Sequence, residues 1–330
     1  MKVFYDEDAN LGVLKNKVLG IMGYGNQGRA QALNLRDSGL NVLVGTQADA
    51  TAQEAREDGF QVVSVAELAP KADLLALLIP DEVQQRVYEE SIRPHLCPGQ
   101  TLLFSHGYAF HYRLIVPPPQ VDVILVAPRM IGAMVRETYV AGSGAPAFVG
   151  VGQDASGHAL ETDLAYARGI GATRAGALET DFARETELDL FQEQALWPLL
   201  VRVMLTSYEF LVSKDFPPEM VALEMYGSGE AAEIFREMAR IGFFKQMRLH
   251  SQTSQYGTLS RSQEISFVHE IHDFMQNALG EIRNRHFAEE WRREQAAGYP
   301  RFNELRALAD EHPMNRAEEL VRQMLRVKPG

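Results

Sequence analysis

A short stretch near the N-terminus constrains the fold of this chain more than any other feature. Lys17–Met22 reads as a buried strand that runs directly into the pattern G-x-G-x-x-G at Gly23, Gly25 and Gly28. In this pattern the first glycine allows a tight turn, the second lets the backbone approach a phosphate, and the third lets the next helix pack on the strand. The unpaired N–H groups and the positive dipole end of that helix favour an anion.

The residues after the glycines support this interpretation. A helical pattern over Gln27–Ser38 and a second strand, Asn41–Gly45, complete a unit of about 30 residues. The unit predicts a site for the pyrophosphate of a dinucleotide, and its candidate contacts are Gly23, Tyr24, Gly25, Asn26, Gln27 and Gly28. A glycine-rich turn that binds nothing is the alternative, and it stays open at this point.

The loop after the second strand bears on which nucleotide is bound. It reads Thr46-Gln47-Ala48-Asp49-Ala50-Thr51 and contains no lysine or arginine. A carboxylate at this place accepts a hydrogen bond from the ribose 2′-hydroxyl, whereas arginine side chains would hold a 2′-phosphate. With Gln47 and Asp49 as candidate contacts, the loop favours NADH over NADPH. Asp49 serves equally well as the N-cap of a helix over Ala50–Asp58, and both readings stay open.

Size and charge place the chain among soluble enzymes. Its 330 residues, 46% of them hydrophobic, exceed what one small core requires and predict two domains. The net charge of −12 argues against nucleic acid as a partner, because phosphate binding draws on clustered Lys and Arg. A single cysteine, Cys97, leaves no intrachain disulfide. Neither a signal peptide nor an uninterrupted apolar run of about 18 residues is found, so we expect a cytoplasmic protein without a membrane partner.

The two halves of the chain differ in pattern. Up to residue 180, strand-like runs alternate with helical patterns, which predicts an α/β domain with a doubly wound parallel sheet. Ligands of such sheets lie beyond the carboxyl ends of the strands, where three segments here carry polar residues: Pro80–Glu82, Ser105–Gly107 and Pro128–Arg129. Pro80, Asp81 and His106 are further candidate contacts of the cofactor. From 181 to 330, a period of 3.6 residues predicts an all-helical domain, with helices over Glu185–Arg202, Tyr208–Lys214, Pro218–Phe244, Ser262–Phe287, Phe302–Glu311 and Arg316–Val327.

The first of these helices carries two acids on one face. Asp189 and Glu193 are four residues apart, so their carboxylates are neighbours and repel each other. The apolar residues around them indicate a largely buried helix, in which a cation would relieve the repulsion. Hard carboxylate oxygens suit Mg²⁺. A solvated acidic helix face is the alternative.

Taken together, these segments resemble the class I, short-form ketol-acid reductoisomerases over nearly the whole chain. The resemblance implies a Rossmann domain over 1–180 and a knotted helical domain over 181–330. It also implies a homodimer or higher homo-oligomer formed through the helical domain, and an NAD(P)H-dependent reduction that follows a Mg²⁺-assisted alkyl shift of an acetohydroxy acid. The segments that carry it are Lys2–Asp6, Gly23–Gln31, Pro80–Glu82, Phe104–Gly107, Gln153–Gly157, Glu179–Thr180, Glu185–Gln194, Pro218–Met220, Ser251, Tyr256–Gly257 and Phe287–Trp291.

The resemblance also implies roles for single residues. Asp189 and Glu193 match the carboxylates that hold the metals, and Glu224 matches one that the neighbouring subunit contributes. Ser251 matches the serine that contacts the substrate carboxylate. His106 matches a polar residue near the metal-bound water and the transferred hydride, although a histidine that only caps a strand end would look the same.

The departures from the family fall where the alkyl shift would occur. The family has a lysine after the proline of its Pro-Lys motif, whereas here Arg129 follows Pro128, and a wide, permanently charged guanidinium is no equivalent of an amine. The family spaces its last two metal-binding glutamates four residues apart. Here Ser228 stands four residues after Glu224, and the next acid, Glu230, lies about 600° further round a helix unless the intervening glycines bulge it.

The residues expected to line the substrate pocket also differ from those of the family. Bulky residues replace small ones at Gln192 and Leu196–Leu200, and Ile79 stands where the family has a small hydroxyl residue. We therefore expect a divergent NAD(P)H-dependent reductase of this family that transfers hydride to a C=O or C=N bond of a small substrate without the alkyl shift. The catalytic candidates are His106, Arg129, Asp189, Glu193 and Ser251. The candidate ligands of a metal are Asp189, Glu193, Glu224 and Glu230. A true ketol-acid reductoisomerase that requires Mg²⁺ and a nucleotide-binding protein without turnover are the alternatives.

Overall fold

The computed structural model describes residues 1–325 and contains two compact units, Met1–Asp189 and Leu190–Gly330. The sequence pattern alone puts the change of character at residue 180. The first unit extends further because the beginning of helix α9 (Phe182–Phe191) packs on the sheet, with Phe182 buried among sheet residues. Each unit is described by itself.

The first unit is built on one sheet of nine strands in the order β1-β9-β8-β7-β6-β5-β2-β3-β4. Six neighbouring strands, from β7 to β4, are parallel. The strands are β1 (Val3–Phe4), β2 (Val18–Met22), β3 (Asn41–Gly45), β4 (Gln61–Val63), β5 (Leu74–Leu77), β6 (Thr101–Phe104), β7 (Asp122–Pro128), β8 (Ala147–Gln153) and β9 (Ala177–Glu179). The six parallel strands from β7 to β4 confirm the predicted doubly wound parallel sheet.

The other end of the sheet is mixed, which the sequence did not indicate. β8 is antiparallel to β7, β9 is parallel to β8, and β1 closes the edge antiparallel to β9. Antiparallel strands at the edge of an otherwise parallel sheet are common in α/β proteins. Hydrophobic periodicity alone does not reveal strand direction, because a buried strand looks the same either way.

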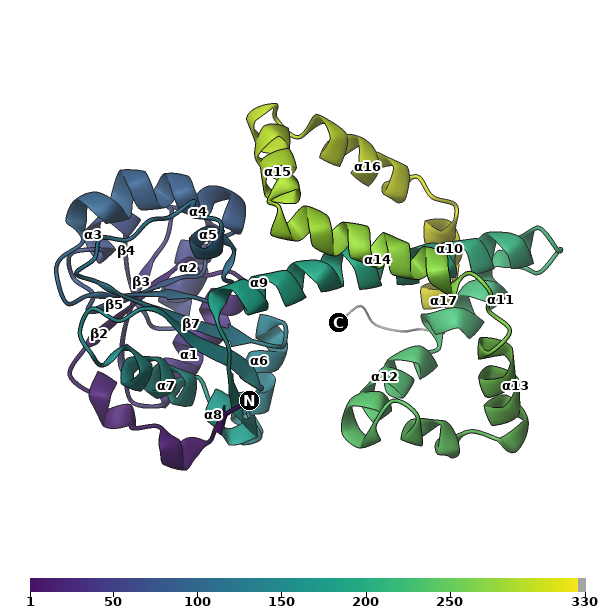
Figure 1. Ribbon diagram of the computed structural model, residues 1–330, viewed down its shortest axis with the longest axis horizontal. Coiled ribbons are helices and arrows are strands. Elements are labelled where there is room, and N and C mark those ends of the chain that lie inside the picture. The colour runs from purple at the N-terminus through teal and green to yellow at the C-terminus, as the bar shows by residue number, and fades with distance from the viewer. Residues whose placement is uncertain (326–330) are drawn as a thin grey trace. The chain divides into compact units, whose positions relative to one another are not determined.

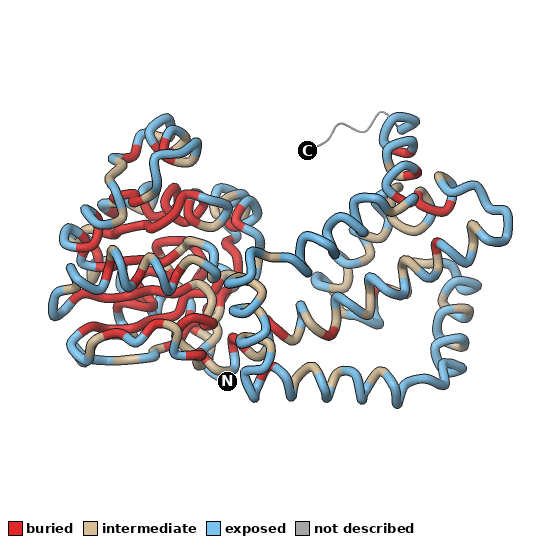
Figure 2. Tube along the Cα trace, turned by 90° about the horizontal axis from the view of Figure 1, so that it is seen from above, coloured by how far each residue is buried: buried red, intermediate tan, exposed pale blue. Residues whose placement is uncertain are grey.

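Helices cover both faces of the sheet (Figure 1). Alternate strand residues enter two separate cores: Ile21 and Val126 belong to one, whereas Met22 and Leu125 belong to the other. The strands are accordingly buried along most of their length (Figure 2). The helices are α1 (Asn26–Asp37), α2 (Ala50–Glu57), α3 (Val65–Leu68), α4 (Asp81–Val87), α5 (Tyr108–His111), α6 (Gly132–Val140), α7 (Ala159–Gly169) and α8 (Ala172–Ala175).

One acid in this core lowers the stability of the fold. Asp163 of α7 is completely buried, and neither of its carboxyl oxygens has a hydrogen bond of normal geometry to the residues that the structure describes. Burial raises the pKa of Asp163 well above its usual value, and the backbone amide of Gly150 opposes this only in part. The folded chain therefore retains a proton that the unfolded chain releases above about pH 4.

We predict that Asp163→Asn stabilises the protein at neutral and alkaline pH. Because the folded-state pKa is raised, the wild type loses stability as the pH rises above the unfolded-state pKa, whereas the asparagine variant does not. Thermal unfolding followed by circular dichroism should give a transition a few degrees higher for the variant at about pH 8, with the difference shrinking toward about pH 4. A difference that does not depend on pH would contradict this account of Asp163.

The second unit is all helical, as predicted. Tyr208, Val221 and Ala317 form part of the small core in which α10, α11 and α17 meet. After α9, its elements are the turn Gln192–Leu196, α10 (Trp197–Val212), α11 (Pro218–Ala222), the turn Leu223–Gly227, α12 (Glu230–Ile241), the turn Lys245–Leu249, α13 (Gln252–Ser262), α14 (Val268–Arg283), α15 (His286–Ala296), α16 (Pro300–Asp310) and α17 (Met314–Leu325).

Two π-helical turns alter the predicted helices. Gln192–Leu196 forms one of them, so Pro198, which cannot donate a helical hydrogen bond, sits in the first turn of α10 and the helix continues. Leu223–Gly227 forms the other. The single helix predicted over Pro218–Phe244 is wrong, because Gly229 adopts φ 87° and ends the helix before α12 begins.

The helical unit exposes much apolar surface. Trp197 is 52% exposed and Phe210 is 59% exposed, and both belong to the long helical stretch Phe182–Val212. By length and composition alone this one helix could cross a membrane, with a mean hydropathy of 1.4 and 11% burial over its most apolar window. A single helix of this kind is weak evidence for a membrane protein, and this one also contains the acids Glu185 and Asp189.

Candidate active site

The glycine loop has the geometry that a bound pyrophosphate needs. Gly23 follows β2 with φ 90°, which a residue with a side chain rarely adopts, and Gly25 is the N-cap of α1. A Cβ on Gly28 would lie 2.1 Å from the carbonyl oxygen of Gly23, so only glycine allows this close packing. A Cβ on Gly25 would meet no protein atom within 4 Å. The second glycine therefore faces open space beside the helix N-terminus.

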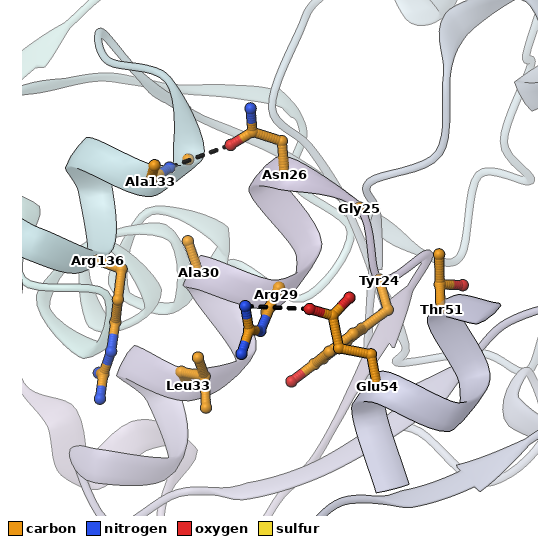
Figure 3. Close-up of a pocket in the computed structure, with 11 residues that line it drawn as sticks. Tyr24, Gly25, Asn26, Arg29, Ala30, Leu33, Thr51, Glu54, Ala133 and Arg136 are labelled. Carbon is orange, nitrogen blue, oxygen red and sulfur yellow. Dashed lines mark hydrogen bonds and ion pairs between the residues drawn. The ribbon is translucent and has the colours of Figure 1, made fainter. Parts of the chain in front are cut away.

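That space is part of a cavity of about 570 Å³ (Figure 3). Three predicted contacts, Tyr24, Gly25 and Asn26, line it. The sequence analysis missed its other walls, including Arg29 of α1 and Glu54 of α2. No sequence motif marks Arg29 and Glu54 as cavity residues, because only the tertiary fold brings them next to the glycine loop. The open cradle and the helix N-terminus fit a dinucleotide phosphate.

Asp49 is the N-cap of helix α2, which is one of the two roles that the sequence left open for it. Its Oδ1 accepts hydrogen bonds from the N–H groups of Thr51 (2.9 Å) and Ala52 (3.3 Å), so it caps α2. The Thr51 hydroxyl also donates to Oδ1, which together with these amides holds the pKa of Asp49 below its usual value. All three bonds end on Oδ1. A ribose contact through Oδ2, and a contact through Gln47, stay predictions.

Arg29 brings a cation into the cofactor cavity, but acids already neutralise it. Its guanidinium lies 3.0 Å from Glu54 and 2.7 Å from Asp58. The hydrogen bond from Arg29 lowers the pKa of Asp58, which also accepts a hydrogen bond of 2.8 Å from the Tyr24 hydroxyl. A 2′-phosphate would therefore compete with two carboxylates for this arginine.

A partly buried chain of amides joins the glycine loop to the carboxyl edge of the sheet. Gln31 of α1 donates to the Gln27 side chain (3.0 Å) and to the Ser105 hydroxyl (3.2 Å), and it accepts a bond of 2.8 Å from Tyr166. Gln27 donates in turn to the carbonyl of Met130 (2.8 Å). The predicted contact Gln27 thus holds the segment after Arg129 instead of facing the cavity.

At the carboxyl edge of the sheet the structure brings together four of the predicted residues. Asp81 begins α4 after Pro80, His106 follows β6, Arg129 follows β7, and Asp189 lies on α9. His106 Nδ1 is 2.7 Å from Asp81, and its Nε2 is 3.5 Å from Asp189. The Arg129 guanidinium forms an ion pair with Asp189.

Glu185, which the sequence analysis did not select, completes the cluster. It is 1% exposed, accepts a hydrogen bond of 2.7 Å from the Gly107 amide and pairs with Arg129 at 3.1 Å. Its spacing of four residues before Asp189 repeats the spacing of Asp189 and Glu193, and this was the available signal. Burial raises the pKa of Glu185.

The charges around His106 change its titration. Burial alone would lower the pKa of His106, but the hydrogen bond and charge of Asp81, assisted by Glu185 and Asp189, raise it to about 9. Because Asp81 holds Nδ1, the ring presents Nε2 to the site.

The remaining predicted residues lie in the helical unit. Glu193 is exposed in the turn after α9, and Ser251 caps α13 by accepting a bond of 3.2 Å from the amide of Ser254. Glu224 and Ser228 are exposed before Gly229, and Glu230 is the first residue of α12. Glu224 therefore lies in a π-helical turn and Glu230 in the next helix. The glycine-rich segment bulges the helix at Leu223–Gly227 and then breaks it at Gly229.

Two family models together match nearly the whole chain. The acetohydroxy acid isomeroreductase NADPH-binding domain matches residues 13–176, and the ketol-acid reductoisomerase C-terminal domain matches residues 182–327.

This chain belongs to the ketol-acid reductoisomerase family.

Relatives of known name agree over their full length. The ketol-acid reductoisomerase (NADP(+)) of Pyrobaculum calidifontis is 43% identical over 98% of both chains. The enzyme of the same name from Methanocaldococcus jannaschii is 41% identical over the same shares. A solved structure of an NADH-preferring ketol-acid reductoisomerase from an uncultured archean superposes with a TM-score of 0.93 at 37% identity, covering 98% of this chain and 99% of that one.

Family membership settles the class of the protein. The chain is an NAD(P)H-dependent oxidoreductase of the ketol-acid reductoisomerase type, with an N-terminal Rossmann-like domain and a helical C-terminal domain. The resemblance inferred from the sequence is thereby confirmed.

Proposed function

We propose that this member of the ketol-acid reductoisomerase family reduces a C=O or C=N bond of a small substrate without the alkyl shift. The helix break at Gly229 carries the proposal. In the family pattern a second glutamate stands four residues after Glu224, but Ser228 occupies that position here, and Glu230 begins a new helix. A serine hydroxyl is a poor substitute for a charged ligand of Mg²⁺.

The residues of this chain do not fit the two-metal centre that an alkyl shift requires. Beside the missing carboxylate, Arg129 stands in the position of the family's lysine and pairs with Glu185 and Asp189. The donor set favours a reaction whose steps use the protein's own groups.

Reduction of a C=O or C=N bond needs only a hydride donor and a proton donor, whereas the alkyl shift also needs a metal. Bound NAD(P)H supplies the hydride. The N–H groups at the start of α1 hold its pyrophosphate beside Gly25, and the cluster at the sheet edge orients the substrate. His106, fixed through Nδ1 by Asp81, directs Nε2 toward the site and donates a proton to the oxygen or nitrogen that the hydride leaves negatively charged. Asp189 positions His106 and Arg129.

A true ketol-acid reductoisomerase is the second candidate, and the identity of 41–43% to enzymes of that name favours it. Asp189, Glu193 and Glu224 also keep three of the matched carboxylates. Under this alternative, Glu230 or a group from another subunit has to replace the missing ligand.

A substrate panel separates the two candidates. Purified protein with NADH would be assayed on simple 2-keto acids and cyclic imines, with Mg²⁺ and again after EDTA treatment. We expect turnover of at least one of them, with a loss of less than about twofold after EDTA, because no step of a simple reduction here uses the metal. Complete loss of all activity with EDTA would refute the proposal.

We further predict that NADH binds at least about tenfold more tightly than NADPH, a difference of about 1.4 kcal/mol. The reasons are the absence of cations from Thr46 to Thr51 and the neutralisation of Arg29 by Glu54 and Asp58. Dissociation constants from NAD(P)H fluorescence would check it. The double variant Glu54→Gln with Asp58→Asn, which frees Arg29, should recover NADPH affinity; an equal preference in wild type would contradict the prediction.

We also propose a cytoplasmic homodimer formed through the helical unit. Exposed apolar side chains on this unit, among them Trp197, Phe210 and Phe235, support a protein partner, because their burial in an interface is favourable. Light scattering of the full chain would test the assembly.

A further inference from the structure

We propose that Arg129 is a built-in cation that occupies the carboxylates of the family's metal site, so that Asp189 takes up a divalent metal only when Arg129 is removed. This rests on the proposed function and states what fills the site instead of a metal.

The contacts of the two carboxylates carry the inference. Asp189 pairs through Oδ1 with Arg129, and its Oδ2 is 3.5 Å from His106 Nε2. Glu185 pairs through Oε1 with Arg129 (3.1 Å), and its Oε2 accepts the Gly107 amide (2.7 Å). Three of these four oxygens therefore accept hydrogen bonds from protein donors, and the fourth, Asp189 Oδ2, lies at ion-pair distance from the His106 ring, whereas a metal ligand must direct a lone pair at the ion.

Arg129 is also held in place from the other side. Its guanidinium stacks over the ring of Phe148 on β8, 5.0 Å from the ring centre. The carbonyl of Met130, next in the chain, is fixed by Gln27. To admit a metal at Asp189, the arginine would have to break two ion pairs and this stacking together. A lysine, with one compact charge, could not span Glu185 and Asp189 in the same way.

The guanidinium of Arg129 thus provides a permanent positive charge beside Asp189, where the family has a metal ion that can be exchanged. A guanidinium donates hydrogen bonds and neutralises charge, but it has no vacant coordination positions. It can orient an oxygen or nitrogen of a substrate for reduction. It cannot bind two substrate oxygens as a metal does.

Metal binding by the full-length protein tests this directly. Mn²⁺ is the probe, because it takes oxygen ligands as Mg²⁺ does and its free ion is counted by electron paramagnetic resonance. The variants are Arg129→Gln, which removes the cation, and Arg129→Lys, which shortens it. Arg184→Gln is the control, since Arg184 is an exposed arginine of α9, the helix that carries Asp189, and pairs with Asp181.

We expect weak Mn²⁺ binding in wild type and in Arg184→Gln, with affinity at least about tenfold higher in Arg129→Gln and intermediate in Arg129→Lys. Circular dichroism reports folding, and if Arg129→Gln does not fold, the lysine variant decides the matter. Equal affinity in wild type and in the folded Arg129 variants would overturn the inference. Tight Mn²⁺ binding by wild type without turnover of acetolactate would overturn it while leaving the proposed function intact. Weak Mn²⁺ binding by wild type together with turnover of acetolactate would refute the proposed function and leave the inference about Arg129 intact.

Discussion

Gly25→Val is expected to weaken NADH binding roughly 100-fold or more, about 2.8 kcal/mol, while the Rossmann domain stays folded. A Cβ at this position meets no protein atom within 4 Å, and the backbone φ of −82° is open to any residue. The valine side chain therefore fills only the space beside the N-terminus of α1, where the pyrophosphate must approach the backbone. Fluorescence titration with NADH measures the loss.

The third glycine provides the matched control. In Gly28→Ala the new Cβ would lie 2.1 Å from the carbonyl oxygen of Gly23, so this smaller substitution should destabilise the fold itself. We expect a clear fall in unfolding temperature for Gly28→Ala and little change for Gly25→Val. Retained NADH affinity in Gly25→Val would mean that the nucleotide is bound elsewhere.

Asp189→Asn is expected to lower kcat about 100-fold or more on whichever substrate is reduced, with an unchanged dissociation constant for NADH. The aspartate pairs with Arg129 and lies 3.5 Å from His106 Nε2, so it holds two catalytic candidates in place. An amide of the same shape keeps the packing but loses the charge that both cations face. Steady-state kinetics and NADH titration separate the two effects.

Asp81→Asn is the informative companion of this variant. Asp81 contacts His106 through the other ring nitrogen, at 2.7 Å, and does not contact Arg129. If His106 is the proton donor, both variants should lower kcat. Activity of Asp189→Asn close to that of wild type would show that the cluster at the sheet edge is not the reaction site.

Local signals predicted the parts of this molecule that local chemistry determines. The spacing of Gly23, Gly25 and Gly28 is set by backbone packing and phosphate approach, so it could be read directly and the structure has the expected loop. His106 could be placed because the carboxyl ends of parallel strands meet at one edge. The glycines after Tyr226 allowed either a bulge or a helix end, and the sequence could not show that a π-helical turn and a break at Gly229 both occur.

Other features depend on the tertiary fold and left little trace in the sequence. The direction of β8 is set by how its connection crosses the sheet and not by its composition. Arg129 was recognised as a departure, but the sequence could not show that it pairs with Glu185 and Asp189, which lie more than 50 residues further along. Asp49 is a cap by local spacing, and the same spacing could not decide whether its other oxygen meets a ribose.

One measurement tests the central claim most directly. The protein would be given acetolactate with NADH and Mg²⁺, and in parallel the 3-hydroxy-2-keto acid in which the alkyl shift has already taken place. The second compound needs only hydride and a proton, whereas the first also needs a metal centre that Arg129 and Ser228 do not support. We predict little or no NADH oxidation with acetolactate and faster oxidation with the 3-hydroxy-2-keto acid. Robust, Mg²⁺-dependent turnover of acetolactate would contradict the account and make this protein an ordinary ketol-acid reductoisomerase.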